Sequence, residues 1–132
     1  MNDLKLCMMA VDARANSYSP YSRFSVGAAL LCADGSVFTG VNVENASFGE
    51  TICAERCAFV SAISSGKRDF VKIAVVGSKT DDISSPCLPC GACRQVMAEF
   101  CDKDFEVLTF NGGAVQKHTL AELLPHSFGL EK

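Results

Sequence analysis

The chain has 132 residues, of which 48% are apolar and 20% charged, and its net charge at pH 7 is -3. A chain of this length and composition can bury one hydrophobic core, so we expect a single domain over residues 1–132. The acidic balance, with no basic cluster beyond Lys67-Arg68, argues against a nucleic-acid partner. No apolar run reaches the length of a transmembrane helix and no signal peptide is recognisable. We therefore expect a cytoplasmic protein without a membrane partner.

The N-terminal residues predict an amphipathic helix from Asp3 to about Asn16. Asn2 or Asp3 can cap its start. Apolar residues recur along it at spacings of three and four, which is typical of a helix with one buried face. We expect that face to pack into the core, and it consists of Leu4, Cys7, Met8, Val11 and Ala15.

Two strands joined by Ala33-Asp34-Gly35 are predicted to form a β-hairpin with a three-residue loop and Gly35 in the left-handed region. In this register Phe24 lies opposite Glu44. Residues two apart share a sheet face, so Phe24, Asn42 and Glu44 project together at the open end. A two-residue turn would shift the register and move Phe24 to the other face. The predicted strands are residues 24–32 and 36–43.

The second half of the chain alternates helices with strands. Thr51 can cap a second helix that Gly66 ends, and Pro89 is suited to the first position of a third. The whole order predicts an α/β fold, with a mixed sheet of about five strands between two helical layers. The predicted elements are helices 52–65, 89–100 and 120–124 and strands 70–77, 105–110 and 114–118.

Eight cysteines are present, and without a secretory signal such clusters are more often metal ligands than disulfides. Cys90 and Cys93 stand three apart at a predicted helix start, so both thiols can point the same way. Cys53 falls in the first turn of another predicted helix. Helix N-termini favour thiolates, and three thiolates with a fourth position left open are typical of a catalytic zinc site.

Two other chemistries remain open for these cysteines. A structural zinc module for protein interaction would need a fourth ligand, and Cys57 and Cys87 are the candidates, although free cysteine commonly behaves as a small apolar residue. A dithiol redox protein would use Cys90 with Cys87 or with Cys93. Neither explains Glu55, which could move protons beside a zinc ion. This role requires the ion to sit off the helix end, because residues two apart share no helix face.

The motifs resemble those of a known family. Cys53-Ala54-Glu55 followed by Pro89-Cys90-Gly91-Ala92-Cys93 is similar to the signature of the zinc-dependent deaminases. The stretches Phe24–Ala29, Gly40–Asn45 and Pro89–Gln95 resemble the small, homotetrameric cytidine deaminases. The resemblance covers nearly the whole chain and implies their three-layer α/β/α fold.

The resemblance also implies a function and a site. The reaction is the hydrolytic deamination of cytidine and deoxycytidine by zinc-activated water, as in pyrimidine salvage, with one Zn²⁺ per chain and Glu55 as the proton shuttle. Arg56 would hydrogen-bond the ligand sulfurs, which offsets their excess negative charge. The implied zinc ligands are Cys53, Cys90 and Cys93, and the implied substrate contacts are Phe24, Asn42, Glu44, Ala54, Ala46, Phe48 and Phe128.

In the homotetramer that the resemblance implies, Ala46, Phe48 and Phe128 serve the sites of neighbouring subunits. Many relatives have tyrosine where this chain has Phe48. A deaminase of a cytosine-nucleoside antibiotic, of the blasticidin type, resembles the chain in the same zinc motifs. The stretch Asn42-Val43-Glu44-Asn45 favours a plain ribose and hence the nucleoside as substrate.

Overall fold

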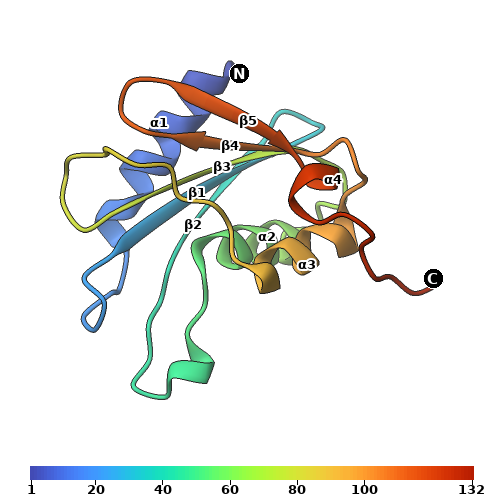
Figure 1. Cartoon of the computed structure of the whole chain (residues 1–132). Helices are drawn as coiled ribbons and strands as arrows, with labels where there is room; N and C mark the ends of the chain where they lie inside the picture. Colours follow the sequence, from blue (N-terminus) through green and yellow to red (C-terminus); the bar gives the residue numbers. More distant parts are fainter.

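The computed structural model describes residues 1–132, and its centre is a mixed sheet of five strands in the order β2-β1-β3-β4-β5 (Figure 1). β3 and β4 are parallel, and the other neighbours are antiparallel. A parallel pair needs a crossover connection, and here the connection carries α3. The strands are β1 Ser25–Cys32, β2 Val37–Val41, β3 Phe70–Ser78, β4 Glu106–Phe110 and β5 Val115–Thr119.

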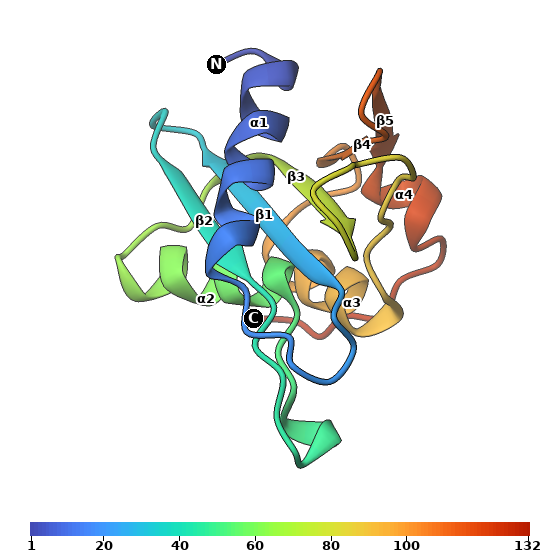
Figure 2. The same ribbon diagram turned by 90° about the vertical axis from the view of Figure 1, so that its left-hand side faces the viewer.

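Helices cover both faces of the sheet, as the sequence predicts. Figures 1 and 2 show α1 on one face and α2 and α3 side by side on the other. α1 is Asp3–Ala13, α2 is Ala54–Ser64, α3 is Gly91–Phe100 and α4 is Leu120–Leu123; the short 3-10 turns are η1 Arg14–Asn16 and η2 Phe48–Glu50. The three-layer α/β/α arrangement is therefore confirmed. No helix has the length and apolar character needed to cross a bilayer.

Each face of the sheet has its own hydrophobic core. Along β1, Ala28 and Leu30 belong to the core under α2 and α3, whereas Ala29 and Leu31 belong to the core under α1. This alternation follows from the two-residue period of a strand. Because both faces are covered, β1 reads as a continuous apolar run.

The predicted three-residue hairpin loop is confirmed. The N–H of Cys32 donates to the carbonyl of Ser36 over 2.9 Å, and Gly35 has φ of 90°. β1 and β2 pair from Leu31 with Val37 to Gly27 with Val41. The two-residue turn would have given a different register and is excluded.

The predicted buried face of the first helix is only partly right. Cys7 is fully buried, but Leu4 and Met8 are exposed, and Leu6 and Ala10 form the contact instead. Gly27 explains the shift, since a Cβ there would lie 2.0 Å from the carbonyl oxygen of Ala10. The missing side chain lets α1 approach β1 along the line through Ala10.

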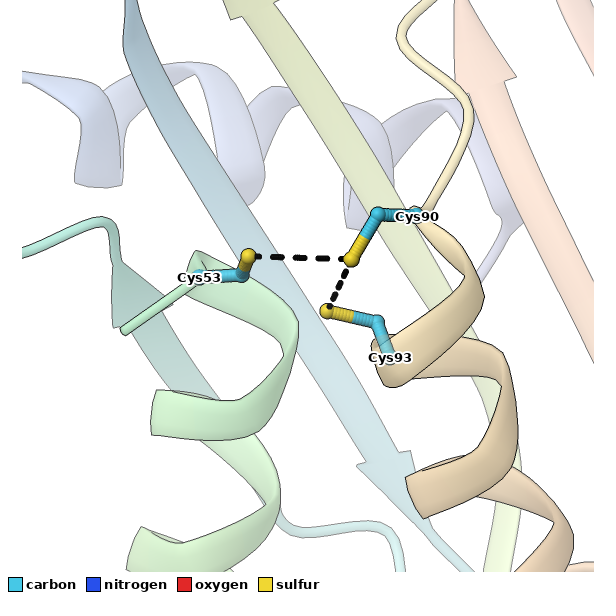
Figure 3. A group of neighbouring side chains, drawn as sticks. All are labelled: Cys53, Cys90 and Cys93. Atoms are coloured by element: carbon cyan, nitrogen blue, oxygen red, sulfur yellow. Dashed lines mark hydrogen bonds between the residues drawn. The ribbon is translucent and has the colours of Figure 1, made fainter. Parts of the chain in front are cut away.

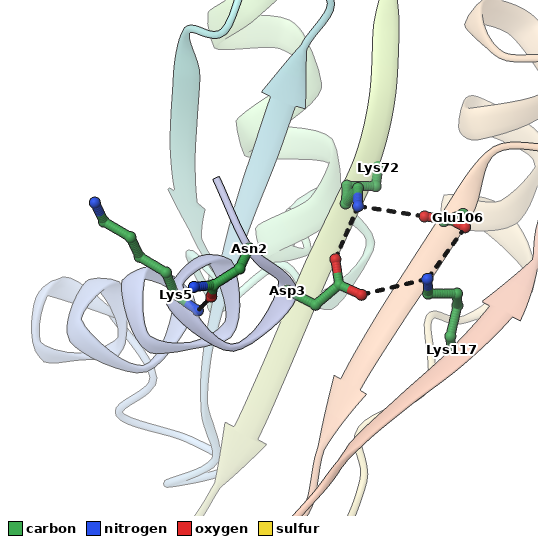
Figure 4. A network of polar contacts seen from close by, with 6 residues as sticks. All are labelled: Asn2, Asp3, Lys5, Lys72, Glu106 and Lys117. Atoms are coloured by element: carbon green, nitrogen blue, oxygen red, sulfur yellow. Dashed lines mark hydrogen bonds and ion pairs between the residues drawn. The ribbon is translucent and has the colours of Figure 1, made fainter.

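The N-terminus of α1 is anchored by charged side chains (Figure 4). Asp3 lies between Lys72 on β3 and Lys117 on β5, at 2.8 and 3.3 Å. Glu106 on β4 contacts the same two lysines, at 3.4 Å each. The four charges alternate in sign and connect α1 to three strands. Asn2 caps the helix by accepting from the N–H of Lys5 over 2.7 Å.

The second and third helices begin later than the sequence predicts. Cys53, not Thr51, is the N-cap of α2, and Cys90 is the N-cap of α3, so that Pro89 precedes the helix. Both cap residues have extended backbones, with ψ of 155° and 170°. The chain therefore reaches each helix as an extended segment and turns at a cysteine.

Candidate metal centre and active site

Three cysteine sulfurs converge between the starts of α2 and α3 (Figure 3). The Sγ atoms of Cys53 and Cys90 are 3.9 Å apart, and those of Cys90 and Cys93 are 3.5 Å apart. All three lie within 4.8 Å of one another. Tetrahedral zinc with Zn–S bonds of about 2.3 Å requires sulfurs about 3.8 Å apart. The donor set thus fits a zinc ion with three protein ligands.

Gly40 allows α2 to deliver its cysteine to this point. A Cβ on Gly40 would lie 2.3 Å from the carbonyl oxygen of Ala54 and 2.4 Å from the backbone nitrogen of Ala58. The first turn of α2 therefore rests directly on the backbone of β2. Because Cys53 caps that turn, its position depends on this close contact.

The cysteine thiols of the cluster shift one another's pKa values. A hydrogen bond from Cys93, together with the Arg56 guanidinium, lowers the pKa of Cys53 to about 5. The same hydrogen bond to Cys53, together with burial, raises the pKa of Cys93. The neighbours of Cys53 therefore favour its thiolate form over that of Cys93. A divalent cation would replace the shared protons, because zinc binds thiolates.

Arg56 supplies the positive charge nearest to the sulfurs. Its Nη2 donates to Sγ of Cys53 over 3.4 Å, and this contact raises its own pKa. Its Nε is buried without a partner. Three thiolates and one Zn²⁺ leave one net negative charge, which a guanidinium at this place offsets.

Glu55 is buried next to the same sulfurs, with 4% of its surface exposed. Burial raises the pKa of its carboxyl group, and the negative charge of Cys53 adds to the effect. Since Cys53 is the N-cap of α2, Glu55 is the second residue of the helix. The extended backbone of Cys53 therefore removes the difficulty that residues two apart share no helix face. A carboxyl group with a raised pKa is suited to exchanging protons near neutral pH.

No fourth sulfur joins the cluster, since neither Cys57 nor Cys87 belongs to the group that could hold a metal. Cys87 packs against the core under α2 and α3, and burial raises its pKa to about 11. Cys57 is half-buried on α2. The set is thus open, as in catalytic zinc sites, whereas structural sites are closed by four ligands.

The predicted substrate face is only partly formed by the hairpin. The pairing of β1 with β2 ends before Glu44, so Phe24 opposite Glu44 is wrong. Beyond Val41, the side chain of Asn42 supplies hydrogen bonds to the residues at the start of β1. Its Oδ1 accepts from the N–H of Val26 over 2.9 Å, and its Nδ2 donates to the carbonyl of Phe24 over 2.8 Å. The chain then turns away, because the N–H of Glu44 donates to the carbonyl of Tyr18 over 2.8 Å.

Hydrogen bonds nevertheless bring the three residues together. The Ser17 hydroxyl donates to Oδ1 of Asn42. The carboxylate of Glu44 accepts from the hydroxyl of Ser22, which in turn accepts from the N–H of Phe24 over 3.0 Å. Phe24 is half-buried, and its ring lies over Gly77, where a Cβ would come within 2.6 Å of it.

Residues 43–51, in the connection between β2 and α2, form an arm that projects from the body of the molecule (Figures 1 and 2). Ala46 is exposed on it, as is Phe48 with 75% of its surface. The rings of Phe48 and Tyr21 meet edge to face, with their centroids 6.0 Å apart. Phe128 in the C-terminal tail is also exposed, at 69%, and its carbonyl accepts from Nε2 of Gln95 over 3.1 Å.

Sequence reasoning missed Ser17, Ser22 and Gly40. The two serines lie in a polar loop and hold Asn42 and Glu44, but no pattern in the sequence links them to those partners. Gly40 interrupts a predicted strand, and a glycine inside a strand does mark a close approach of backbone. That signal could have identified the contact with α2.

Known proteins resemble this chain over nearly its whole length. The family model described as the cytidine and deoxycytidylate deaminase zinc-binding region matches residues 1–109. A cytidine deaminase from Halalkalibacterium halodurans is 53% identical over 132 residues, which cover 99% of this chain and 97% of that protein.

A solved structure and a more distant relative complete the comparison. The crystal structure of cytidine deaminase from Burkholderia pseudomallei is 47% identical, with a TM-score of 0.89 over 97% of this chain and 100% of that chain. A blasticidin-S deaminase from Bacillus cereus is 32% identical over 127 residues, which cover 93% of this chain and 89% of that protein. The cysteine cluster thus lies within the matched zinc-binding region, and the chain belongs to the cytidine and deoxycytidylate deaminase family.

Proposed function

We propose that the protein deaminates cytidine and deoxycytidine by hydrolysis, giving uridine or deoxyuridine and ammonia. The observation that carries this proposal is the convergence of three sulfurs within 4.8 Å beside a buried carboxyl group. The higher identity to cytidine deaminase than to blasticidin-S deaminase, 53% against 32%, favours the plain nucleoside. Such an enzyme acts in pyrimidine salvage.

Cys53, Cys90 and Cys93 hold the zinc ion, one per chain, and Arg56 offsets the excess charge of the thiolates. When bound, zinc supplies a Lewis acid that makes water a stronger acid at neutral pH. The three cysteines would hold the ion between two helix starts. Three protein ligands would leave a fourth position for water, as in catalytic zinc sites.

Glu55 moves the protons. Its carboxylate takes a proton from the attacking water and delivers it to N3 of the cytosine ring, while the water oxygen bonds to C4. Glu55 then transfers the second proton of that water to the amino group on C4, which leaves as ammonia. Water and cytidine are thereby converted to uridine and ammonia, with no net change at Glu55. The raised pKa of this carboxyl group assists both transfers.

The substrate lies between the metal cluster and the residues at the open end of the hairpin. Phe24 packs against the pyrimidine, and the backbone around Ala54 hydrogen-bonds the base. Glu44 and Asn42 bind the sugar hydroxyls. Asn42 already uses its amide oxygen and one amide hydrogen within the chain, which leaves one donor for the sugar. Glu44 makes the stronger contact, because its acceptor is charged.

A homotetramer completes each site. Ala46 and Phe48 lie on the projecting arm and Phe128 in the tail, and both aromatic rings are exposed. Exposed aromatic residues on projecting segments are suited to burial against another subunit. They contribute to substrate contacts in neighbouring subunits. The presence of eight free cysteines, three of them needed as thiolates, favours a reducing compartment such as the cytoplasm.

The loss of cytidine absorbance on deamination tests the proposal. Zinc-loaded protein should consume cytidine, and a chelator should stop the reaction until zinc is restored. Blasticidin S offered in competition should be a much poorer substrate. Absence of turnover by the zinc-loaded protein would contradict the proposed function.

A further inference from the structure

The carboxylate of Glu44 is held by a single loop. The N–H groups of Tyr21 and Ser22 donate to Oε1 over 3.0 and 3.1 Å, and the hydroxyl of Ser22 donates to Oε2. Ser22 is thus the one residue that contacts both carboxylate oxygens. The carboxylate lies at a cavity of about 410 Å³ that Ser22, Glu44, Phe48 and Thr51 help to line.

The hydroxyl of Ser22 is itself fixed in place. It accepts from the N–H of Phe24 over 3.0 Å. The next residue, Arg23, has φ of 61°, and its N–H donates to the carbonyl of Ser19 over 3.0 Å. A non-glycine residue in the left-handed region persists only where the surroundings enforce it. The loop is therefore preformed, and one hydroxyl connects Glu44 with Phe24.

A glutamate carboxylate can accept about four hydrogen bonds, and three donors are already in place. Without the Ser22 hydroxyl, the two remaining donors would both contact Oε1. The carboxylate could then turn about Oε1, and the direction of Oε2 would no longer be fixed. We propose that Ser22 is a positioning residue, whose hydroxyl aims Oε2 of Glu44 at the 3′-hydroxyl of the nucleoside. This inference rests on the proposed function and identifies what sets sugar recognition at that site.

Two substrates that differ only in the 3′-hydroxyl test the proposal. kcat/KM is measured for 2′-deoxycytidine and 2′,3′-dideoxycytidine with the zinc-loaded protein and with Ser22→Ala. The wild type should prefer deoxycytidine, and Ser22→Ala should reduce that preference about tenfold, because a hydrogen bond to a charged group is lost. KM for deoxycytidine should rise while kcat changes little, as expected for a contact made equally in ground and transition states.

Matched variants separate positioning from general damage. Ser22→Thr keeps the hydroxyl and should restore the wild-type preference. Ser36→Ala removes a serine hydroxyl at the hairpin turn that contacts Asp34 rather than Glu44, and it should leave the preference unchanged. If Ser22→Ala does not fold, Ser22→Cys, which keeps the size but is a weak donor, should show the same loss.

Two results would overturn the role of Ser22: an unchanged preference in the Ala or Cys variant, or an equal fall of kcat/KM for both substrates. Failure of the wild type to deaminate deoxycytidine would instead overturn the proposed function. The two failures are therefore distinguishable.

Discussion

The side chains at the metal centre each have an ordinary helical explanation when taken alone. A glutamate in a first turn is favoured by the helix dipole, and a free cysteine commonly packs as a small apolar side chain. Their combination has no such explanation, because Glu55 is buried beside three sulfurs and has a raised pKa. An ionisable group whose pKa is shifted by burial and by a neighbouring charge is typical of a functional site.

The first prediction concerns Glu55. Glu55→Gln should retain zinc, because the three sulfurs are untouched, and should lower kcat by about 10² to 10⁴-fold through loss of proton transfer. Zinc content by atomic absorption and cytidine turnover measure the two effects. Glu131→Gln, an exposed glutamate of the tail, should behave as wild type. A Glu55→Gln protein of normal turnover would exclude the proton-shuttle role.

At the scale of elements, the site depends on how closely two helices approach the sheet. α2 begins at Ala54 because the chain arrives extended and turns at Cys53. Gly40 on β2 permits the contact beneath that turn. The position of a zinc ligand is therefore determined by a glycine on another element.

Gly40→Ala should accordingly damage both stability and metal binding. The new Cβ would overlap the backbone of α2, which should cost about 1 to 3 kcal/mol in the free energy of unfolding. Zinc should also pass more quickly to a competing chelator. Thermal unfolding and chelator kinetics measure these effects, with Gly129→Ala as the control, since a Cβ there meets no atom within 4 Å. An unchanged melting temperature together with unchanged zinc release would contradict this account.

The ion pairs at the start of α1 predict a dependence of stability on pH. Lys72 lowers the pKa of Asp3 from its ordinary value of 3.8, and Lys117 adds to the effect. A lowered pKa means that this stabilisation is complete above about pH 4 and is lost as the pH falls through the pKa of the folded state.

Asp3→Asn should therefore lower the free energy of unfolding by about 1 kcal/mol at pH 7, and by progressively less below pH 4. Unfolding curves at several pH values measure the difference from wild type. Asp12→Asn removes an exposed carboxylate of the same helix and should produce no such loss at pH 7. A deficit in Asp3→Asn that persists undiminished at pH 2 would exclude the ion pairs as its cause.

At the scale of the whole molecule, the arm and the tail are parts without an evident role in the isolated chain. Phe48 and Phe128 expose most of their surface, whereas the rest of the fold is organised around two cores. In the proposed tetramer, both side chains are buried against neighbouring subunits. It also predicts that one chain can complete the site of another.

Subunit mixing measures this directly. Phe128→Ala and Glu55→Gln are each expected to lower activity. Co-expressed, they should recover about a quarter of the wild-type activity per site, because a random mixture combines an intact Glu55 with a neighbour's Phe128 at that frequency. Activity no greater than the sum of the separate variants would show that Phe128 does not serve a neighbouring subunit.

Local pattern in the sequence determined much of this protein. The order of helices and strands predicted the layers, and the Ala33-Asp34-Gly35 loop predicted the register of the hairpin, because a turn of fixed length fixes its pairing. The cysteine motifs identified the cluster that the structure brings together. These features depend on neighbours a few residues apart or on chemistry carried by the residue types themselves.

Only the tertiary structure decided where helices begin and which partners the polar side chains choose. Cys53 is the N-cap of a helix whose first turn rests on Gly40. The side chain of Asn42 bonds the N–H of Val26, and the backbone carbonyl of Asn42 accepts from Tyr18 instead. The hydroxyl of Ser22 donates to the carboxylate of Glu44, which lies 22 residues further along the chain. Such contacts depend on the simultaneous packing of distant segments, and no local pattern contains that information.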